Sequence, residues 1–370
     1  MAQPAYPALF RAEFSADICS FLRRYEAMPG GAPSAFQAAG WLQAWYRQLG
    51  AQPGVLPLWL CISDGAGRDV LLLPLISRRA AGLRRVEMAD LGITDYNAAL
   101  CNASFKFDPS QRQALRRVVR QALRGHDLLA LGKMLHTPGN AALHALMPAQ
   151  PCDFFGNHVQ LGDDWDGWRY SLEKTVRKEL ERSWRVFQKY PDARFVRATN
   201  QGEANSLFQA LETLQSARMQ HAGAAYQLDK PAYRAFYQDR LQSGLETGEV
   251  ILTALVSAQD VVAVLYGIHH QGRYVMLRIC HAGDTWKPCS PGKLLIERTM
   301  HHLHQQGCRY FDFAIGDYFH KRVFQVRPTP LWDGRLALSW RGWVALQGWR
   351  AKRALKRQPW CVRWLEKRRR

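Results

Sequence analysis

The sequence has few of the features that mark secreted, membrane-spanning or metal-binding proteins. Its 8 cysteines include no Cys-x-x-Cys pair, so neither a zinc site nor a disulfide framework is indicated, and reduced thiols are expected. The longest apolar runs, such as Val261–Ile268, fall far short of the roughly 20 residues that cross a bilayer. Residues 1–20 lack the uninterrupted apolar segment of a signal peptide. A cytoplasmic location and no metal are therefore expected.

Motifs of several enzyme classes are also missing. The chain has no Gly-x-Ser-x-Gly, no Gly-x-x-x-x-Gly-Lys-Ser/Thr and no Gly-x-Gly-x-x-Gly, which removes the usual support for an esterase-type hydrolase, a nucleoside triphosphatase and a dinucleotide-binding enzyme. Cys280 and His281 are neighbours on a strand-like run. Because adjacent strand residues point to opposite faces, they are not expected to form a nucleophile pair.

Acidic residues are scarce, and the shortage is uneven. The chain carries 50 Lys and Arg against 31 Asp and Glu, a formal net charge of +19. Residues 341–370 hold eleven of the basic residues and one acid, Glu366, so this tail contributes +10 and the other 340 residues only +9. The body of the chain is therefore not expected to bind nucleic acid.

The tail also contains tryptophans among its basic residues, namely Trp340, Trp343, Trp349, Trp360 and Trp364. Interfacial Trp with Lys and Arg suits peripheral contact with an anionic membrane, which would place the protein at the inner membrane face. A solvated tail and nucleic-acid binding are the alternatives.

The length predicts two domains. At 370 residues the chain is more than twice the roughly 150 residues of a typical domain, and 47% hydrophobic residues can fill sizeable cores. The order of patterns recurs: a helix-like stretch, three strand-like runs, an amphipathic helix and one more strand. These segments are residues 36–49, 56–62, 70–76, 83–91, 109–123 and 128–131 in the first half, and 232–245, 250–256, 261–269, 274–281, 291–304 and 310–313 in the second. Between the halves, residues 165–190 have the pattern of one helix ending before Pro191.

The second half contains a series of short motifs in a characteristic order. Ser290-Pro291-Gly292-Lys293-Leu294-Leu295 opens a helix, Tyr310-Phe311-Asp312-Phe313 forms the next strand, and Gly316-Asp317-Tyr318-Phe319-His320-Lys321 follows. In this order they resemble the GNAT-like acyltransferases of the CelD type, which are often associated with cellulose or other exopolysaccharide loci. The resemblance extends over residues 30–330, with Trp41, Trp45 and Asp95-Tyr96-Asn97 in the first half. The family usually has Tyr where this chain has His320, so if that position touches substrate or acts as an acid, its chemistry is altered here.

The resemblance implies an α/β (α+β) fold of two tandem GNAT-like domains with mixed, largely antiparallel sheets, as in Fem-type proteins. The expected domains are residues 1–162 for the N-terminal half, 163–192 for the connecting helix, 193–335 for a C-terminal half that binds acyl-CoA, and 336–370 for the basic tail.

The expected acyl-CoA site is the helix start at Ser290, Pro291, Gly292, Lys293 and Leu294. A helix N-terminus offers unpaired N–H groups and a favourable dipole to a pyrophosphate. Ser290 can cap the helix, Pro291 suits its first turn, Gly292 allows close approach and Lys293 adds positive charge. The alternative is an ordinary helix start. The first half opens its corresponding helix with Asp108-Pro109-Ser110, without glycine, so only the second half is expected to bind CoA.

Acyl transfer needs a proton acceptor and a donor for the departing thiolate. Asp317 is the preferred base or amine anchor, and Tyr318 or His320 the acid, although Gly316-Asp317 could simply form a turn. Lys321 is expected to pair with a substrate carboxylate or phosphate, or to be solvated. Asp312 is expected to be a buried structural acid.

The resemblance implies that Asp95, Tyr96, Asn97 and Arg177 contact the acceptor, although Asp-Tyr-Asn also suits a turn. The leading hypothesis is an acyl-CoA-dependent N- or O-acyltransferase, with acetyl-CoA or another acyl-CoA as co-substrate. Its acceptor would be a sugar, nucleotide-sugar or lipid-linked precursor in cell-envelope or exopolysaccharide synthesis. The alternative is a Fem-like transferase that uses aminoacyl-tRNA, or a non-catalytic binding protein of the same fold.

Overall fold

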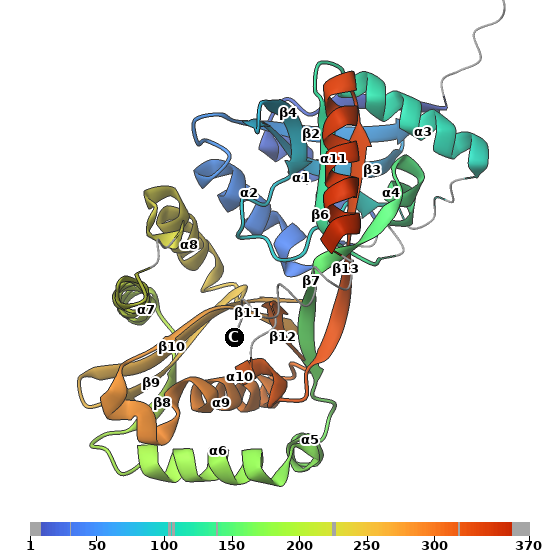
Figure 1. The fold of residues 1–370 in the computed structure, drawn as a ribbon. Helices are drawn as coiled ribbons and strands as arrows, with labels where there is room; N and C mark the ends of the chain where they lie inside the picture. Colours follow the sequence, from blue (N-terminus) through green and yellow to red (C-terminus); the bar gives the residue numbers. More distant parts are fainter. Residues whose placement is uncertain are drawn as a thin grey trace, which may run out of the picture. The chain divides into compact units, whose positions relative to one another are not determined.

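The structure is a computed structural model that describes residues 9–29, 31–102, 105, 108–137, 140–223, 227–316 and 319–356 (Figure 1). Its contacts divide the chain into two compact units. Unit 1 comprises the described residues within 1–33, 53–152 and 332–370, and unit 2 those within 34–52 and 153–331. Each unit has its own hydrophobic core.

Unit 2 is built on a mixed sheet with the strand order β7, β12, β11, β10, β9, β8. The strands are β7 (Ala149–Gln160), β8 (Arg194–Arg197), β9 (Val250–Ser257), β10 (Asp260–His270), β11 (Arg273–His281) and β12 (Tyr310–Ile315). Neighbouring strands are antiparallel except β11 and β12, which run parallel. β9 and most of β10 are buried along their length because helices cover both faces of the sheet.

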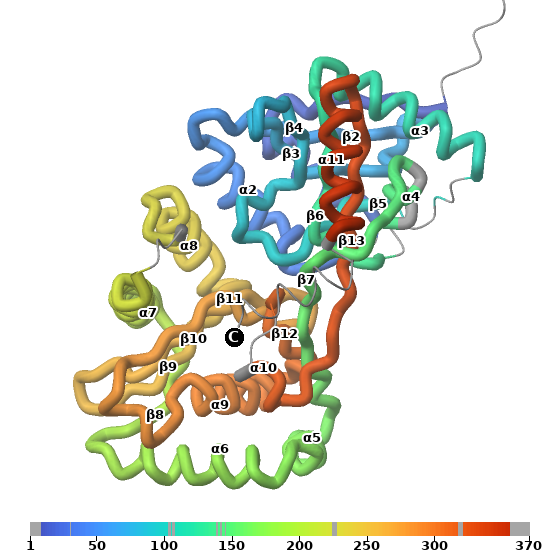
Figure 2. Tube along the Cα trace, in the orientation of Figure 1, coloured from blue at the N-terminus to red at the C-terminus, as the bar shows by residue number. Residues whose placement is uncertain are grey.

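Helices α7 (Gln201–His221) and α8 (Pro231–Gly244) lie on one face of this sheet, and α9 (Pro291–Gln305) lies on the other with α6 (Lys174–Phe187) outside it (Figure 2). A short 3-10 helix at Asp284–Cys289 leads from β11 into α9. The chain then returns through β12 to α10 (Phe319–Arg322).

Unit 1 has the strand order β1, β2, β3, β4, β6. These are β1 (Phe10–Phe14), β2 (Val55–Asp64), β3 (Asp69–Ala80), β4 (Leu83–Met88) and β6 (Leu128–Leu135), with the two-residue β5 (Leu100–Cys101) pairing with β3. Its helices are α1 (Ile18–Ala27), α3 (Pro109–Ala122), α4 (Ala141–Leu146) and α11 (Trp340–Lys356). Strands β4 and β6 run parallel and the other main pairs antiparallel.

The predicted repeat is confirmed by the topology. In the first half α2 (Ala39–Gln48) precedes β2, β3, β4, α3 and β6; in the second half α8 precedes β9, β10, β11, α9 and β12. In both copies the first three strands form an antiparallel meander and the last pair is parallel. The fold is thus α/β with mixed sheets, as expected from the sequence.

The compact units do not coincide with the sequence halves, because elements are exchanged between them. Helix α2 belongs to unit 2, where the ring of Trp41 lies 4.8 Å from that of Phe236 on α8. Residues from Asp153 of β7 lie in unit 2, whereas residues from Trp332 of β13 (Arg327–Ala337) lie in unit 1. The boundaries of the two units therefore differ from those of the expected domains, which were residues 1–162, 163–192, 193–335 and 336–370.

The prediction of one helix over residues 165–190 is wrong. The segment forms α5 (Trp165–Ser171) and α6, separated by Leu172 and Glu173 in extended conformations. Leu172 is 2% exposed and packs in the core of unit 2. Inserting this side chain into the core breaks the helix, which periodicity alone did not indicate.

Gly267 of β10 provides the space for a buried aromatic ring next to an irregularity of β11. The strand pairing passes from Tyr266 with Arg278 to Gly267 with Met276, which leaves Leu277 as an extra residue in β11. A Cβ at position 267 would come within 2.2 Å of the Tyr274 ring. Tyr274 is 0% exposed, so the ring has no room to move aside.

We expect Gly267→Ala to lower the free energy of unfolding by about 1–3 kcal/mol, because the added methyl overpacks the core. Thermal unfolding followed by circular dichroism measures the change. Gly283→Ala is the control, since a Cβ there meets nothing within 4 Å. Equal melting temperatures for the two variants would contradict the packing argument.

Candidate functional site

Strands β11 and β12 separate soon after they meet. Their parallel pairing covers only Arg273 with Tyr310, Tyr274 with Phe311 and Val275 with Asp312. Beyond these pairs β11 continues to His281 with β10 on its other edge, and β12 continues to Ile315. The strands that flank α9 therefore splay apart. This separation leaves an edge of β11 whose backbone groups do not pair with β12.

A cavity of about 430 Å³ lies where β11 ends and α9 begins. The carboxyl end of β11 contributes Ile279 and His281, and the start of α9 contributes Ser290, Gly292 and Lys293. Other lining residues come from α7 and the 3-10 helix, namely Arg218, Asp284 and Lys287. The turn that begins with Ser290 is thus accessible, and a molecule in the cavity would meet the first turn of α9.

Ser290 precedes the first turn of α9 but does not cap the helix with its side chain. The prediction that it caps the helix through its side chain is wrong: Ser290 has φ +45° and ψ +56° and makes no side-chain cap hydrogen bond. Its hydroxyl instead contacts a carboxylate oxygen of Glu179 at 3.4 Å. The Ser290 carbonyl accepts the Leu294 N–H at 3.1 Å, so the amides of Gly292 and Lys293 belong to the first turn, whose N–H groups have no acceptor within the helix.

The corresponding helix of the first half is capped. The Asp108 carboxylate accepts a hydrogen bond from the Gln111 N–H at 2.8 Å, and the Gln111 side chain accepts one from the Asp108 N–H at 3.0 Å. The hydrogen bond from the Gln111 N–H, followed by that from the Ser110 hydroxyl, lowers the pKa of Asp108, so the carboxylate stays ionised at the N-terminus of α3. A protein carboxylate thus occupies on α3 the position that an anionic ligand could take on α9.

Positive charge surrounds the cavity, and two carboxylates, those of Asp284 and Glu179, reduce it. Arg218, Lys287 and Lys293 line the cavity with a single carboxylate, Asp284. The Lys293 ammonium forms an ion pair with Glu179 of α6 at 2.8 Å. Both partners are partly exposed, with 26% and 37% of their side-chain surfaces accessible, so the pair can exchange with a ligand at little cost.

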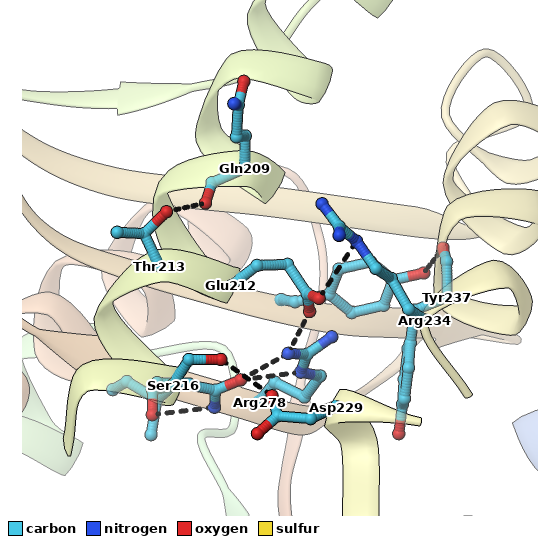
Figure 3. A network of polar contacts seen from close by, with 11 residues as sticks. Gln209, Glu212, Thr213, Ser216, Asp229, Arg234, Tyr237 and Arg278 are labelled. Carbon is cyan, nitrogen blue, oxygen red and sulfur yellow. Dashed lines mark hydrogen bonds and ion pairs between the residues drawn. The ribbon is translucent and has the colours of Figure 1, made fainter. Parts of the chain in front are cut away.

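A polar network joins β11 to helices α7 and α8 (Figure 3). Arg278 of β11 reaches Glu212 and donates through Nε to Gln215 of α7 at 2.9 Å. The guanidinium also lies 4.8 Å from the centre of the Tyr237 ring, and Arg234 approaches the second oxygen of Glu212 at 3.4 Å. Arg278 is buried, and its Nη1 has no hydrogen-bond partner among the residues the structure describes.

The predicted catalytic residues are only partly described. Asp317 and Tyr318 lie outside the described residues, and His320 falls in α10 without a described side chain. They follow β12 in the sequence, and their catalytic roles stay predictions.

Lys321 and Asp312 are both buried at the end of β12. The expectation that Asp312 is a buried structural acid is confirmed: it is 5% exposed and accepts the Ala314 N–H at 2.7 Å. Lys321 is 4% exposed and donates to the carbonyl of Ile315 at 2.8 Å, with those of Ala314 and Gly316 nearby. The solvated alternative for Lys321 is therefore wrong. Its ammonium holds the end of β12, and binding of substrate by Lys321 stays a prediction.

The predicted acceptor residues do not form one cluster within a unit. Asp95, Tyr96 and Asn97 belong to unit 1, whereas Arg177 lies on α6 of unit 2. Tyr96 and Asn97 are buried, and the Asn97 amide donates to Asp90 at 3.0 Å and to the Gly132 carbonyl at 2.8 Å. The Arg177 guanidinium lies 5.1 Å from the centre of the Tyr170 ring.

Several residues of the site escaped the sequence analysis. Arg218, Glu212 and Glu179 lie on helices where charged residues usually face solvent, and no motif distinguishes them. Arg278 could have been noticed, since it interrupts the apolar run of β11. A charged residue within such a run is most often paired when it is buried.

Comparisons with known proteins agree with this geometry. Residues 174–322 match the family described as Acetyltransferase (GNAT) domain, and this range contains every residue that lines the cavity. A crystal structure of FemX superposes with a TM-score of 0.59 at 10% identity, covering 87% of this chain and 96% of that one. The C-terminal domain of a putative lysylphosphatidylglycerol synthetase from Agrobacterium fabrum gives a TM-score of 0.54 at 11% identity, with 90% and 96% covered.

These similarities show a GNAT fold, and residues 174–322 are similar to a GNAT acetyltransferase domain. A search of curated proteins gave no match. The resemblance to the CelD type stays a prediction. Among the described residues, no helix is both long and apolar enough to span a membrane, and no three His, Cys, Asp or Glu side chains gather as metal ligands would.

We expect Lys321→Met to lower the free energy of unfolding by about 1–3 kcal/mol, because the Ile315 carbonyl at the end of β12 loses its hydrogen bond from the ammonium. Urea unfolding measures the loss, with Lys189→Met, at an exposed position after α6, as the control. Unchanged stability of Lys321→Met would show that the ammonium does not support β12 and would favour the substrate-binding role.

Proposed function

We propose that this protein is an acyl-CoA-dependent acyltransferase that moves an acyl group, expected to be acetyl, directly to an amine or hydroxyl of its acceptor. The observation that carries the proposal is the cavity at the uncapped start of α9, beside strands that separate. The match of residues 174–322 to a GNAT acetyltransferase domain supports it.

The phosphate end of the donor would bind at the first turn of α9. The amides of Gly292 and Lys293 and the positive end of the helix dipole suit a pyrophosphate. Arg218 and Lys287 line the same cavity and add charge-assisted donors. Gly292 keeps the backbone approachable: a Cβ there would already stand 3.2 Å from the His281 ring.

The pantetheine arm would extend along the open edge of β11. Beyond Val275 this edge does not pair with β12, so its N–H and C=O groups suit the amides of an extended arm, much as an added strand would. The thioester would then lie in the space between the strands, towards the end of β12. A backbone N–H there would stabilise the oxyanion formed on the thioester carbonyl.

Transfer requires that the acceptor lose a proton and the departing thiolate gain one. A new C–N or C–O bond forms as the C–S bond breaks. Asp317 is proposed as the base or amine anchor and Tyr318 or His320 as the acid, because all three follow β12 directly in the sequence. The acceptor is proposed to be a sugar, nucleotide-sugar or lipid-linked precursor in cell-envelope or exopolysaccharide synthesis.

The test of the donor site is Gly292→Val, measured by calorimetric titration with acetyl-CoA. The branched side chain would fill the phosphate subsite, and we expect at least about tenfold weaker binding. Gly202→Val is the matched control, because Gly202 is likewise the second residue of its helix, α7, and a Cβ there meets Asn200 at 3.3 Å.

No binding of any acyl-CoA by the native protein would refute the proposal. The Fem-like alternative predicts instead that aminoacyl-tRNA binds, with an affinity that falls steeply as salt rises. Acetyl-CoA binding that Gly292→Val leaves intact would place the donor elsewhere in the protein.

Removing the carboxylate of Glu179 should have the opposite effect. We expect Glu179→Ala to bind acetyl-CoA about two- to fivefold more tightly, because a negative charge leaves the helix N-terminus and Lys293 is released. Titration at low and high salt measures the gain, which screening should reduce. Glu181→Ala on the same helix, whose carboxylate lies near Arg169, should leave binding unchanged. Weaker binding of Glu179→Ala would mean that the Lys293 pair is needed to shape the site.

A further inference from the structure

Helix α11 of unit 1 has an apolar outer face that the described residues leave uncovered. Trp340 is 76% exposed, and Trp343, Val344 and Leu355 are 58%, 54% and 54% exposed. These four are all of the exposed large hydrophobic residues in the described part of the second half of the chain. Isolated apolar residues are normal on a surface, but a group on one helix marks an interaction site.

The exposed residues form one continuous stripe. At about 100° per residue, positions i, i+3, i+4, i+7, i+11, i+14 and i+15 share a helix face. From Trp340 these positions are occupied by Trp340, Trp343, Val344, Gln347, Ala351, Ala354 and Leu355. Gln347 is the one polar residue among them. We call this set the outer stripe.

The opposite face of α11 is fixed to unit 1, so the outer stripe is held in place. Leu346 is buried, and the Trp349 ring lies 4.3 Å from the Arg335 guanidinium. The start of the helix approaches Asp127, the residue before β6, so closely that a Cβ at Gly342 would collide with the Asp127 carbonyl. The Ser339 hydroxyl and the Asp127 carboxylate are hydrogen-bonded at the same place.

Basic residues flank the outer stripe on both edges. On the same wheel, Arg341 and Lys352 lie on one edge and Arg350 on the other, and all three are exposed. Between Trp340 and Lys356 the sequence holds five Lys or Arg and no acid. An apolar centre with basic edges is the arrangement of a helix that lies in the plane of a bilayer surface, its apolar side among the acyl chains and its cations among the phosphates.

We propose that the outer stripe of α11 binds the surface of an anionic lipid bilayer. Two features favour lipid over the other partners. Val344 and Leu355 are aliphatic and give no stacking surface to bases, and the cations lie at the edges rather than at the centre, where a nucleic-acid backbone would run. A second copy of the chain would bring two helices of equal positive charge together, which opposes pairing. The proposal goes beyond the proposed function and does not depend on it.

The test uses the full chain and sedimentation with vesicles of phosphatidylglycerol and phosphatidylcholine, compared with phosphatidylcholine alone. The native protein should sediment with the anionic vesicles only. Trp340→Ser with Trp343→Ser should reduce partitioning at least about tenfold by removing apolar contact. Arg350→Glu with Lys352→Glu should do the same, since each cation near the headgroups contributes to attraction.

Matched controls separate this face from exposed apolar area and from net charge in general. Leu56→Ser removes an apolar residue that is 59% exposed on β2. Arg112→Glu with Arg116→Glu reverses two exposed charges on α3 of the same unit. Both variants should bind vesicles within about twofold of the native protein, because none of these three residues lies on the outer stripe. Melting temperatures confirm that all variants fold.

Three results would overturn the proposal. The native protein could fail to bind anionic vesicles, or the two α11 variants could bind as the native protein does. The α3 variant could lose as much binding as the α11 charge variant, which would show that binding depends only on the net charge of the protein. Dimers that dissociate on Trp340→Ser, or RNA binding lost in the α11 variants without vesicle binding, would assign the stripe to those partners instead.

Discussion

The early separation of β11 and β12 is the constraint on which the proposed site depends. Parallel strands that stay paired satisfy each other's backbone groups and leave no space between them. Here the extra residue Leu277 bends β11, and β12 is turned by Ala314, which has φ +59°. The side chains of Asn157 and Lys321 bind the carbonyls around Ala314 and hold that turn. Buried polar groups in unit 2 thus keep an edge of β11 open.

The sequence predicted the helices and strands well, but it did not predict which of them pack against one another. Apolar periodicity located the meanders and helices of both copies within a few residues, because each buried strand or helix face must be apolar. The exchange of α2 into unit 2 could not be foreseen. The buried face of that helix, with Trp41 and Trp45, would suit any apolar surface, and nothing in its pattern specifies α8. The break at Leu172 was missed for a similar reason.

The sequence likewise predicted only part of the candidate site. Ser290-Pro291-Gly292 correctly indicated a helix start at an accessible cavity, because proline and glycine restrict the backbone locally. The capping role of Ser290 failed because a positive φ turns its side chain away from the amides it was expected to bind. Arg218 and Glu179 reach the turn from other helices. Such long-range neighbours depend on how helices pack, which spacing in the sequence does not encode.

The two copies of the repeat show how one helix start can be opened or closed to an anion. Both helices begin with proline in the first turn and follow the third strand of a meander. In α3 a charged Asp108 satisfies the first amides, and in α9 Ser290 leaves them to the cavity. The difference needs only one side chain and one backbone angle. This supports a division of roles between the copies, with the donor held by the second.

The proposed roles of the cavity and of α11 together narrow the choice of acceptor. An enzyme held at a bilayer would meet a soluble sugar or nucleotide-sugar at no higher concentration than elsewhere, since such an acceptor is evenly distributed in the solution. A lipid-linked precursor is confined to the bilayer surface, and an enzyme bound there by α11 would meet it at a much higher effective concentration. Acyl-CoA is water-soluble at its phosphate end and can reach the α9 cavity from solution. Among the three acceptor classes, the lipid-linked one is therefore the only one for which the basic, tryptophan-bearing helix would raise the rate of transfer.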